Sequence, residues 1–235
     1  MAKTAVLIHG CHLEAVGWEN IVWGNPREGI LGRAPRGLLE AYRRDAALVI
    51  WGTGASQKDG KKESRYTFDY TMGRLGELAT IPVSGPTYPV EPLRGFLLSR
   101  SALDIETQNT TEEIRAALDL CTQRGIEELY LVSSPTHVAR CLQEATKLLA
   151  ERGNNHDVLV YATPSDTCFA DSTPADVVIV EPPHRGDMPL WQTYRYVRAM
   201  FGILRQGSGR FQGFLFDLGD LLKKYGVKVD WKPFV

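Results

Sequence analysis

Short, unbroken runs of apolar residues recur along the chain, and between them apolar residues recur every three or four positions. Strands inside a parallel sheet are buried on both faces, so they read as continuous apolar runs. The pattern therefore predicts strands at residues 5–8, 47–51, 129–132, 158–161 and 177–180.

The segments between these runs have the spacing of amphipathic helices. The clearest helix begins after a cap at Thr110 or Thr111 and ends at Gly125. Its apolar residues share one face: Ile114, Ala117, Leu118 and Cys121. The helix after residue 132 ends before Gly153, and its apolar face comprises Val138, Cys141, Leu142, Ala145, Leu148 and Leu149. Because Cys121 and Cys141 lie on apolar faces, we expect both thiols to be buried.

Further helices are predicted at residues 35–44, from residue 63 onward, at 190–205 and at 211–224. Strands that alternate with helices form right-handed βαβ units and a parallel sheet. The expected fold class is α/β, a Rossmann-like three-layer sandwich with a mostly parallel sheet and extra C-terminal helices. We expect one domain over residues 1–235, and the pattern leaves open whether residues 165–235 form a helical cap. Residues 10–32 show no period and are expected to form a long loop, and such loops are often functional.

Composition excludes several classes of protein. The chain has 235 residues, 43% of them hydrophobic and 23% charged, with a formal net charge of −1. This is ordinary globular composition without the basic excess that nucleic-acid binding needs. No apolar run is long enough to cross a membrane, the first residues do not resemble a signal peptide, and the four cysteines form no CxxC motif. We therefore expect a cytoplasmic protein with reduced thiols and a small-molecule partner, neither nucleic acid nor membrane; its oligomeric state is left open.

Polar and ionisable residues follow the predicted strands. In parallel α/β sheets, ligands bind outside the carboxyl ends of the strands. The segments at these ends are His9–Gly10–Cys11–His12, Gly52–Thr53–Gly54, Ser133–Ser134–Pro135–Thr136–His137, Thr163–Pro164–Ser165 and Pro182–Pro183–His184–Arg185. The predicted ligand site therefore includes His9, His12, Ser133, Ser134 and His184.

His137 and Arg140 are one turn apart at the start of a predicted helix. The free N–H groups of a helix amino terminus favour an anion, and an arginine fork adds to that preference. Read for function, His137 is an acid or base and Arg140 an anion ligand. Read structurally, they are a first-turn histidine and a surface arginine. Spacing alone favours neither interpretation.

Two further motifs also have structural explanations. Capping, with Thr or Asn as the cap and Glu in the first turn, accounts for Thr110 and Glu113, whereas we assign Asn109 a mixed role in orienting a ligand or loop and place Glu112 in the vicinity of the site. Gly52–Thr53–Gly54 is either a tight turn or a close approach to a phosphate or ribose. It matches neither the dinucleotide fingerprint nor the P-loop.

A metal site is disfavoured. His9, Cys11 and His12 lack a companion ligand pair in the sequence, although Cys168 or His184 could join them from other strand ends. We therefore expect no metal, and we expect His9 or His12 to contact substrate. Serine hydrolase chemistry is disfavoured as well, because Ser134 is not in a G-x-S-x-G motif. Ser134 is instead expected to hold a phosphate or hydroxyl group.

Three stretches resemble the YdcF/SanA/ElyC family, with matching order and spacing over roughly residues 33–150. The first comprises Arg36, the Gly52–Thr53–Gly54 turn and Glu63–Ser64. The second is Glu106–Thr107–Gln108–Asn109–Thr110–Thr111–Glu112. The third is Leu131–Val132–Ser133–Ser134–Pro135–Thr136–His137–Val138–Ala139–Arg140. The chain departs from the family at His9–Gly10–Cys11–His12, where a Gly-rich turn is usual. It also lacks the membrane anchor of the SanA-like and ElyC-like members, so it is closest to the soluble YdcF type.

The resemblance implies a Rossmann-like fold and a small-molecule site, with S-adenosylmethionine as a candidate ligand, but no single reaction. In this reading Arg36 and Arg140 bind an anion, and His137 is the acid or base with Glu63 or Glu112 as its carboxylate counterpart. We expect an enzyme that acts by hydrolysis or group transfer on a small anionic or nucleotide-like metabolite. A dinucleotide-dependent oxidoreductase is disfavoured because the fingerprint is absent. The alternatives are a non-catalytic nucleotide or S-adenosylmethionine binding protein and, disfavoured by the missing anchor, a cell-envelope factor.

Overall fold

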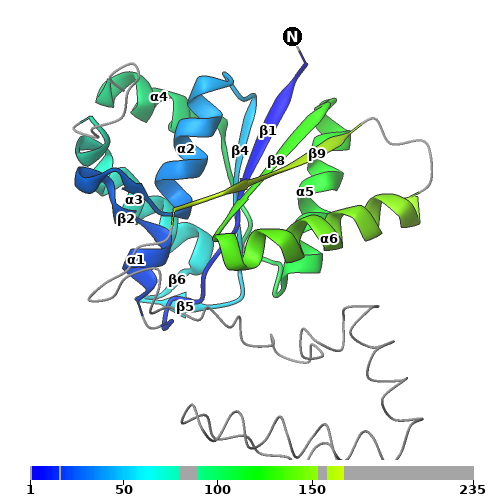
Figure 1. The fold of residues 1–235 in the computed structure, drawn as a ribbon, viewed down its shortest axis with the longest axis horizontal. Helices are drawn as coiled ribbons and strands as arrows, with labels where there is room; N and C mark the ends of the chain where they lie inside the picture. Colours follow the sequence, from blue (N-terminus) through cyan, green and yellow to red (C-terminus); the bar gives the residue numbers. More distant parts are fainter. Residues whose placement is uncertain (1, 16, 80–88, 153–157, 167–235) are drawn as a thin grey trace, which may run out of the picture. The chain divides into compact units, whose positions relative to one another are not determined.

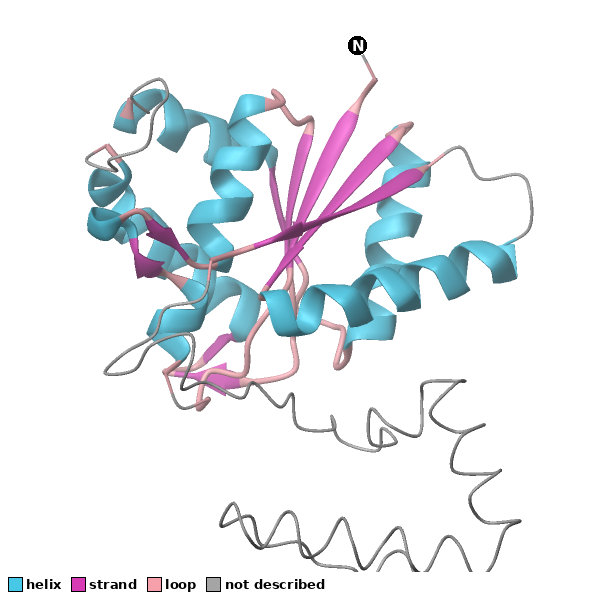
Figure 2. Cartoon of the chain, viewed as in Figure 1, coloured by secondary structure: helices cyan, strands magenta, loops and turns pink. Residues whose placement is uncertain are grey.

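A computed structural model describes residues 2–15, 17–79, 89–152 and 158–166. Their fold is α/β, built on a five-stranded sheet in the order β7-β4-β1-β8-β9 (Figures 1 and 2). The strands are β1 (Thr4–Ile8), β4 (Leu48–Trp51), β7 (Ser101–Leu103), β8 (Glu128–Ser133) and β9 (Leu159–Pro164). All four pairings in this sheet are parallel. The order is that of a doubly wound sheet, which begins in the middle and grows outward in both directions.

Helices cover both faces of the sheet and make a three-layer sandwich. Figure 1 shows one face under α1 (Trp18–Val22), α2 (Arg33–Arg43), α3 (Glu63–Leu78) and α4 (Val90–Arg100). The other face lies under α5 (Thr110–Arg124) and α6 (Pro135–Arg152). Two short antiparallel pairs and the 3-10 helix η1 (Pro26–Glu28) complete the described elements. The pairs are β2 (Gly24–Asn25) with β3 (Ile30–Leu31), and β5 (Gln57–Lys58) with β6 (Lys61–Lys62).

The strands β1, β4 and β8 each contribute alternate side chains to two separate cores. In β1, Val6 and Ile8 pack with the helices α1 to α4, whereas Ala5 and Leu7 pack with α5 and α6. This follows from the two-residue period of a strand, which sends successive side chains to opposite faces. The same alternation assigns a face to the first polar residue after each strand.

Four of the predicted strands are present within three residues of the predicted bounds, and the predicted helices up to residue 152 are present as well. The cap of α5 is Asn109 rather than either threonine, because its side chain accepts a hydrogen bond from the Glu112 N–H. Leu142 is 37% exposed, contrary to the prediction, because it is rotated about 100° from the buried Cys141. Cys121 and Cys141 are buried, as predicted.

Two segments contain more regular structure than the sequence suggested. The expected long loop at residues 10–32 holds α1 and the β2–β3 pair. Residues 90–103 hold α4 and β7, neither of which was predicted. All three residues of β7 are only half-buried, so this strand lacks the apolar signature of the others. The predicted strand at 177–180, both C-terminal helices and nearly all of the 165–235 segment lie outside the described residues.

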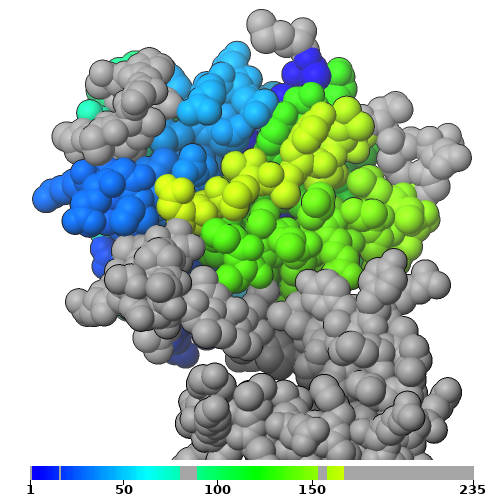
Figure 3. Space-filling model, in the orientation of Figure 1, coloured from blue at the N-terminus to red at the C-terminus, as the bar shows by residue number. Residues whose placement is uncertain are grey.

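The outer strand β9 is partly open to solvent, as the space-filling view shows (Figure 3). Leu159 is 60% exposed and Tyr161 is 39% exposed. Tyr161 stacks on Tyr130 at 4.8 Å, and the Arg44 guanidinium lies 3.8 Å from the centre of the Tyr130 ring. Across the described part of the chain, none of the helices is long and apolar enough to cross a membrane.

Candidate functional site

The candidate site lies at the carboxyl ends of β1 and β8, the two central strands. The connections from β1 run to α2 and β4 on one side, and those from β8 run to α6 and β9 on the other. Successive strands are therefore added in one direction from β1 and in the opposite direction from β8. Open α/β sheets bind ligands at such a switch point. The residues at these two strand ends are His9–Gly10, which follow β1, and Ser133–Ser134, of which Ser133 is the last residue of β8.

His9 and Glu113 form a buried ion pair on the α5 side of this edge. His9 has the same strand parity as Leu7, so its ring points toward α5, where Nδ1 lies 2.6 Å from Glu113 Oε2. The Gly10 N–H donates to the other carboxylate oxygen at 3.3 Å. A β-carbon on Gly52 would overlap Glu113 Oε1, so the carboxylate fills the space above that glycine. Glu113 thus joins the ends of β1 and β4 to the start of α5.

The electrostatics of this pair favour the charged form of histidine. Burial alone lowers the pKa of His9, but nearby Cys141 and the Glu113 carboxylate more than reverse this effect and raise it to about 10. This environment therefore favours the imidazolium form of His9 at neutral pH. Its Nε2 is buried and forms no hydrogen bond with any residue in the described ranges.

His137 lies beside this pair, in the first turn of α6. Its ring meets that of His9 edge-on, with the centroids 5.8 Å apart. Ser133 Oγ is 2.8 Å from Nδ1, Thr110 Oγ1 is 3.3 Å from Nε2, and Cys141 Sγ is 3.4 Å from Nδ1. The structure thus brings together four of the predicted site residues in one buried polar cluster, namely His9, Thr110, Ser133 and His137.

Arg33 reaches the same edge from α2, on the opposite side of the sheet. Its Nε donates to Ser134 Oγ at 2.9 Å, and its Nη1 donates to the carbonyl oxygen of Gly10. The residue is only 8% exposed, yet no carboxylate of the described chain lies within ion-pair distance. Buried charges in proteins are normally paired, so a guanidinium with two neutral partners is suited to receive an anion.

Glu63, the first residue of α3, lies against Gly10 from the β4 side. A β-carbon on Gly10 would overlap Glu63 Oε1, and Ser56 Oγ donates to Glu63 Oε2. Burial raises the pKa of Glu63 to about 7, and the Glu113 carboxylate adds to this effect, whereas the Ser56 hydrogen bond and the Arg33 charge oppose it. This carboxyl group can therefore either give or take a proton near neutral pH.

Several predicted site residues make contacts that have a structural explanation. Glu112 accepts hydrogen bonds from the Gln108 N–H and from Asn109 Nδ2, both at 2.8 Å, so its exposed side chain completes a capping arrangement with Asn109. Thr53 Oγ1 donates to the carbonyl of Thr107 at 2.7 Å, and the Gly54 N–H donates to the same carbonyl at 2.9 Å. These contacts hold the two loops together and favour the tight-turn interpretation.

The remaining predicted residues are dispersed. Arg36 donates to both carboxylate oxygens of Asp166, at 2.8 and 2.9 Å, so an internal carboxylate already occupies it. His12 is exposed, and Arg140 is half-buried on the second turn of α6. His184 and Cys168 lie outside the described residues. Within those that are described, no group of three or more His, Cys, Asp or Glu side chains is arranged to hold a metal ion.

Sequence reasoning overlooked Arg33 and the pairing of Glu113, although helix phase carried a signal for both. Glu113 is four residues before the buried Ala117, on the inner face of α5, whereas Glu112 is rotated away. Arg33 is four residues before Gly37, which packs against Ile8. Residues four apart lie on one helix face, so both charged side chains start on the face that meets the sheet.

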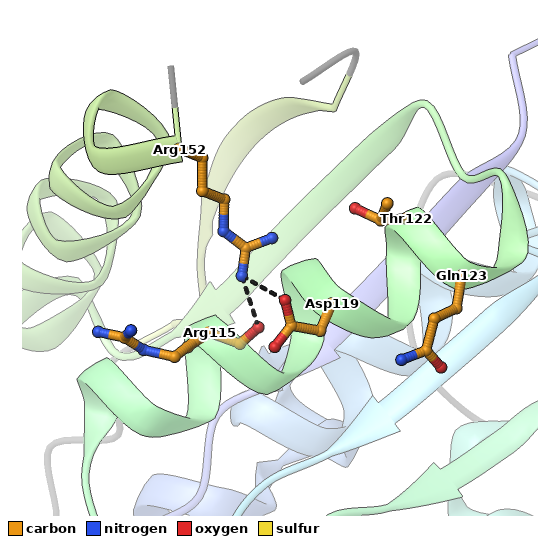
Figure 4. A pocket seen from close by; sticks show the side chains of 5 residues that line it. All are labelled: Arg115, Asp119, Thr122, Gln123 and Arg152. Atoms are coloured by element: carbon orange, nitrogen blue, oxygen red, sulfur yellow. Dashed lines mark hydrogen bonds and ion pairs between the residues drawn. The ribbon is translucent and has the colours of Figure 1, made fainter. Parts of the chain in front are cut away.

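A groove of about 500 Å³ lies between α5 and α6, away from this edge (Figure 4). It is lined by Arg115, Asp119, Thr122, Gln123 and Arg152. Arg152 donates to Asp119 at 2.6 Å, so its charge is already matched within the groove.

Comparison with family models, curated proteins and solved structures finds no match to this chain.

Proposed function

We propose that this protein is an enzyme that binds a small anionic metabolite between the carboxyl ends of β1 and β8. It acts on this metabolite by hydrolysis or group transfer. Arg33 binds the anionic group, and Glu63 is the general acid or base. His9, Glu113 and His137 form the polar floor of the site.

The observation that carries this proposal is the buried Arg33 guanidinium, which has no carboxylate partner among the residues that the structure describes. A charge removed from water is costly unless an opposite charge or full hydrogen bonding compensates it. Two neutral acceptors leave donors of the guanidinium for a ligand. Arg36 offers a direct contrast, because Asp166 already accepts two hydrogen bonds from it.

The position of Glu63 supports turnover in addition to binding. Arg33 and Glu63 both contact Gly10, one at its carbonyl oxygen and the other beside its α-carbon. An anion held by Arg33 would thus lie near a carboxyl group that titrates around neutral pH. A general acid or base is most effective when its pKa lies near the working pH. Hydrolysis and group transfer both need such a proton donor or acceptor.

A second candidate function is nucleotide or S-adenosylmethionine binding without turnover. The strand order favours it, because doubly wound sheets with this order commonly bind nucleotides at the switch point. However, β4, the next strand of the five-stranded sheet after β1 in sequence, is followed by Gly52–Thr53–Gly54 and not by the carboxylate that typically binds a ribose. We therefore prefer the enzyme.

Native mass spectrometry of protein purified without dialysis tests the binding step. We expect a small anionic adduct that is lost in Arg33→Lys, because lysine cannot reproduce the guanidinium fork, and retained in the matched control Arg36→Lys. An adduct that survives Arg33→Lys but disappears in Arg36→Lys would place the site elsewhere. Once the adduct is identified, Glu63→Gln should keep the ligand but form no product. Product formation equal to wild type would remove Glu63 from the mechanism.

A further inference from the structure

Four charged or titratable side chains surround Gly10, and together they limit the charge that the site can accept. His9 and Glu113 are paired at 2.6 Å and cancel each other. Arg33 contributes one positive charge through its bond to the Gly10 carbonyl. Glu63 contributes either one negative charge or none, depending on its protonation. The buried cluster is therefore neutral when Glu63 is ionised and carries one positive charge when Glu63 is protonated.

A ligand bound at Arg33 changes this balance. Glu63 and the incoming group both carry negative charge, and like charges in a buried site cannot both stay ionised without large cost. The guanidinium that now favours the ionised form of Glu63 would be shared with the ligand. Both effects favour protonation of Glu63, and the cluster then has room for one negative charge.

We propose that the site takes a singly charged oxyanion, a carboxylate or a phosphodiester, and takes up one proton on Glu63 as it binds. This inference rests on the proposed function, because it concerns the same site. The inference restricts the ligands to singly charged oxyanions. A doubly charged phosphate monoester or sulfate is excluded because it would leave one buried negative charge uncompensated.

The groups that face Glu63 come from four parts of the chain. Ser56 donates to its carboxylate, the backbone of Cys11 also hydrogen-bonds it, and Glu113, from α5, repels it. Arg33, from α2, attracts it. The Cys11 thiol itself has a pKa raised by burial, so it stays neutral at neutral pH. Arg33 is therefore the one cation among these groups, and the charge on Glu63 depends on whether Arg33 has another partner.

The experiment follows the carboxyl carbon of Glu63 by NMR in protein labelled with ¹³C-glutamate, titrated with base, and assigned with Glu63→Gln. The probes are acetate, dimethyl phosphate and sulfate, added separately. Without a probe we expect a midpoint near 7. With acetate or dimethyl phosphate, we expect the midpoint to rise by about one unit or more, and the affinity for that anion to fall about tenfold per pH unit between the two midpoints. The two monoanion probes show which oxyanion the site prefers.

The outcomes separate this inference from the proposed function. If no probe binds, or if binding survives Arg33→Lys unchanged, the anion site itself is wrong. If a monoanion binds through Arg33 while the Glu63 midpoint stays in place, proton uptake is wrong and the anion site stands. If sulfate binds more tightly than both monoanions, the single-charge rule is overturned. The wild-type titration decides these points even if Glu63→Gln fails to fold.

Discussion

The ion pair of His9 and Glu113 predicts a destabilisation that depends strongly on pH when Glu113 is replaced by glutamine. Glutamine keeps the shape of the side chain and can still accept a hydrogen bond from a neutral histidine. It cannot compensate a buried imidazolium. In the variant, the raising effect of Glu113 is lost while that of Cys141 stays, so the pKa of His9 should fall from about 10 toward its ordinary value of 6.5.

The sign and size of the effect follow from proton linkage. The folded protein raises the pKa of His9 from 6.5 to about 10, so the stability that the charged pair provides is complete below 6.5 and is lost as the pH rises through 10. These two pKa values correspond to about 4 kcal/mol at pH 7 and less than about 1 kcal/mol at pH 10. The larger figure falls in the usual range for removing one partner of a buried ion pair, about 3–5 kcal/mol.

Urea denaturation of wild type and Glu113→Gln at pH 7 and pH 10 measures this difference. We expect a loss of up to about 4 kcal/mol at the lower pH, because Cys141 shares the effect on His9 with Glu113, and of less than about 1 kcal/mol at the higher pH. The matched control is Glu112→Gln, which alters the neighbouring exposed carboxylate and should cost less than about 1 kcal/mol at both pH values. An equal loss at both pH values for Glu113→Gln would show that His9 is neutral in the folded protein and that the assigned ion pair is wrong.

Three further predictions concern the same region and its surroundings. Gly52→Ala should lower the free energy of unfolding by more than about 3 kcal/mol, because its β-carbon would overlap Glu113 Oε1. Gly76→Ala, in open space on α3, should raise it by about 0.5–1 kcal/mol, and thermal melts measure both. Cys121 and Cys141 should react slowly with a thiol reagent in the native protein, because both are fully buried and burial raises the pKa of Cys121 to about 12. Fast reaction of both thiols would contradict the packing of the two helices. Arg140 is not among the residues that meet around Gly10, so Arg140→Lys should change ligand affinity by less than about 1 kcal/mol, and a loss of about 1.5–3 kcal/mol with little change in melting temperature would favour the anion site predicted from the sequence.

The strands and long helices could be predicted because their signals are local. The apolar runs of β1, β4 and β8 are each fully buried, and the phases of α5 and α6 are set by their own apolar residues. By contrast, β7 has three half-buried residues, and its place in the sheet comes from pairing with β4. A strand that depends on its neighbour rather than on its own composition leaves little trace in sequence.

The site was predictable in its location but not in its pairings. Strand ends identified His9, Ser133 and His137 correctly as neighbours at one edge. The partner of His9 is 104 positions away, and that of Ser134 is 101 positions away, so no local pattern relates them. Arg36 and Arg33 are one turn apart on α2, and the resemblance pointed to Arg36. The sequence could not show that Asp166 would already pair with Arg36 and leave Arg33 without a carboxylate among the described residues.

Strand parity explains why the site combines side chains from both faces of the sheet. His9 and Ser133 continue the parity of Leu7 and Leu131, so they turn toward α5 and α6 and meet Glu113 and His137. Ser134, one residue later, turns the other way and meets Arg33 from α2.

Gly10 lies between these two groups of side chains, and a side chain on it would displace the Glu63 carboxyl group. Its two backbone polar groups are divided accordingly, since the N–H donates to Glu113 and the carbonyl accepts from Arg33. A single peptide segment without a side chain therefore holds an anion-binding cation and a titrating carboxyl group next to each other. For this reason we expect substitution of Gly10 to impair ligand binding and the Glu63 titration together.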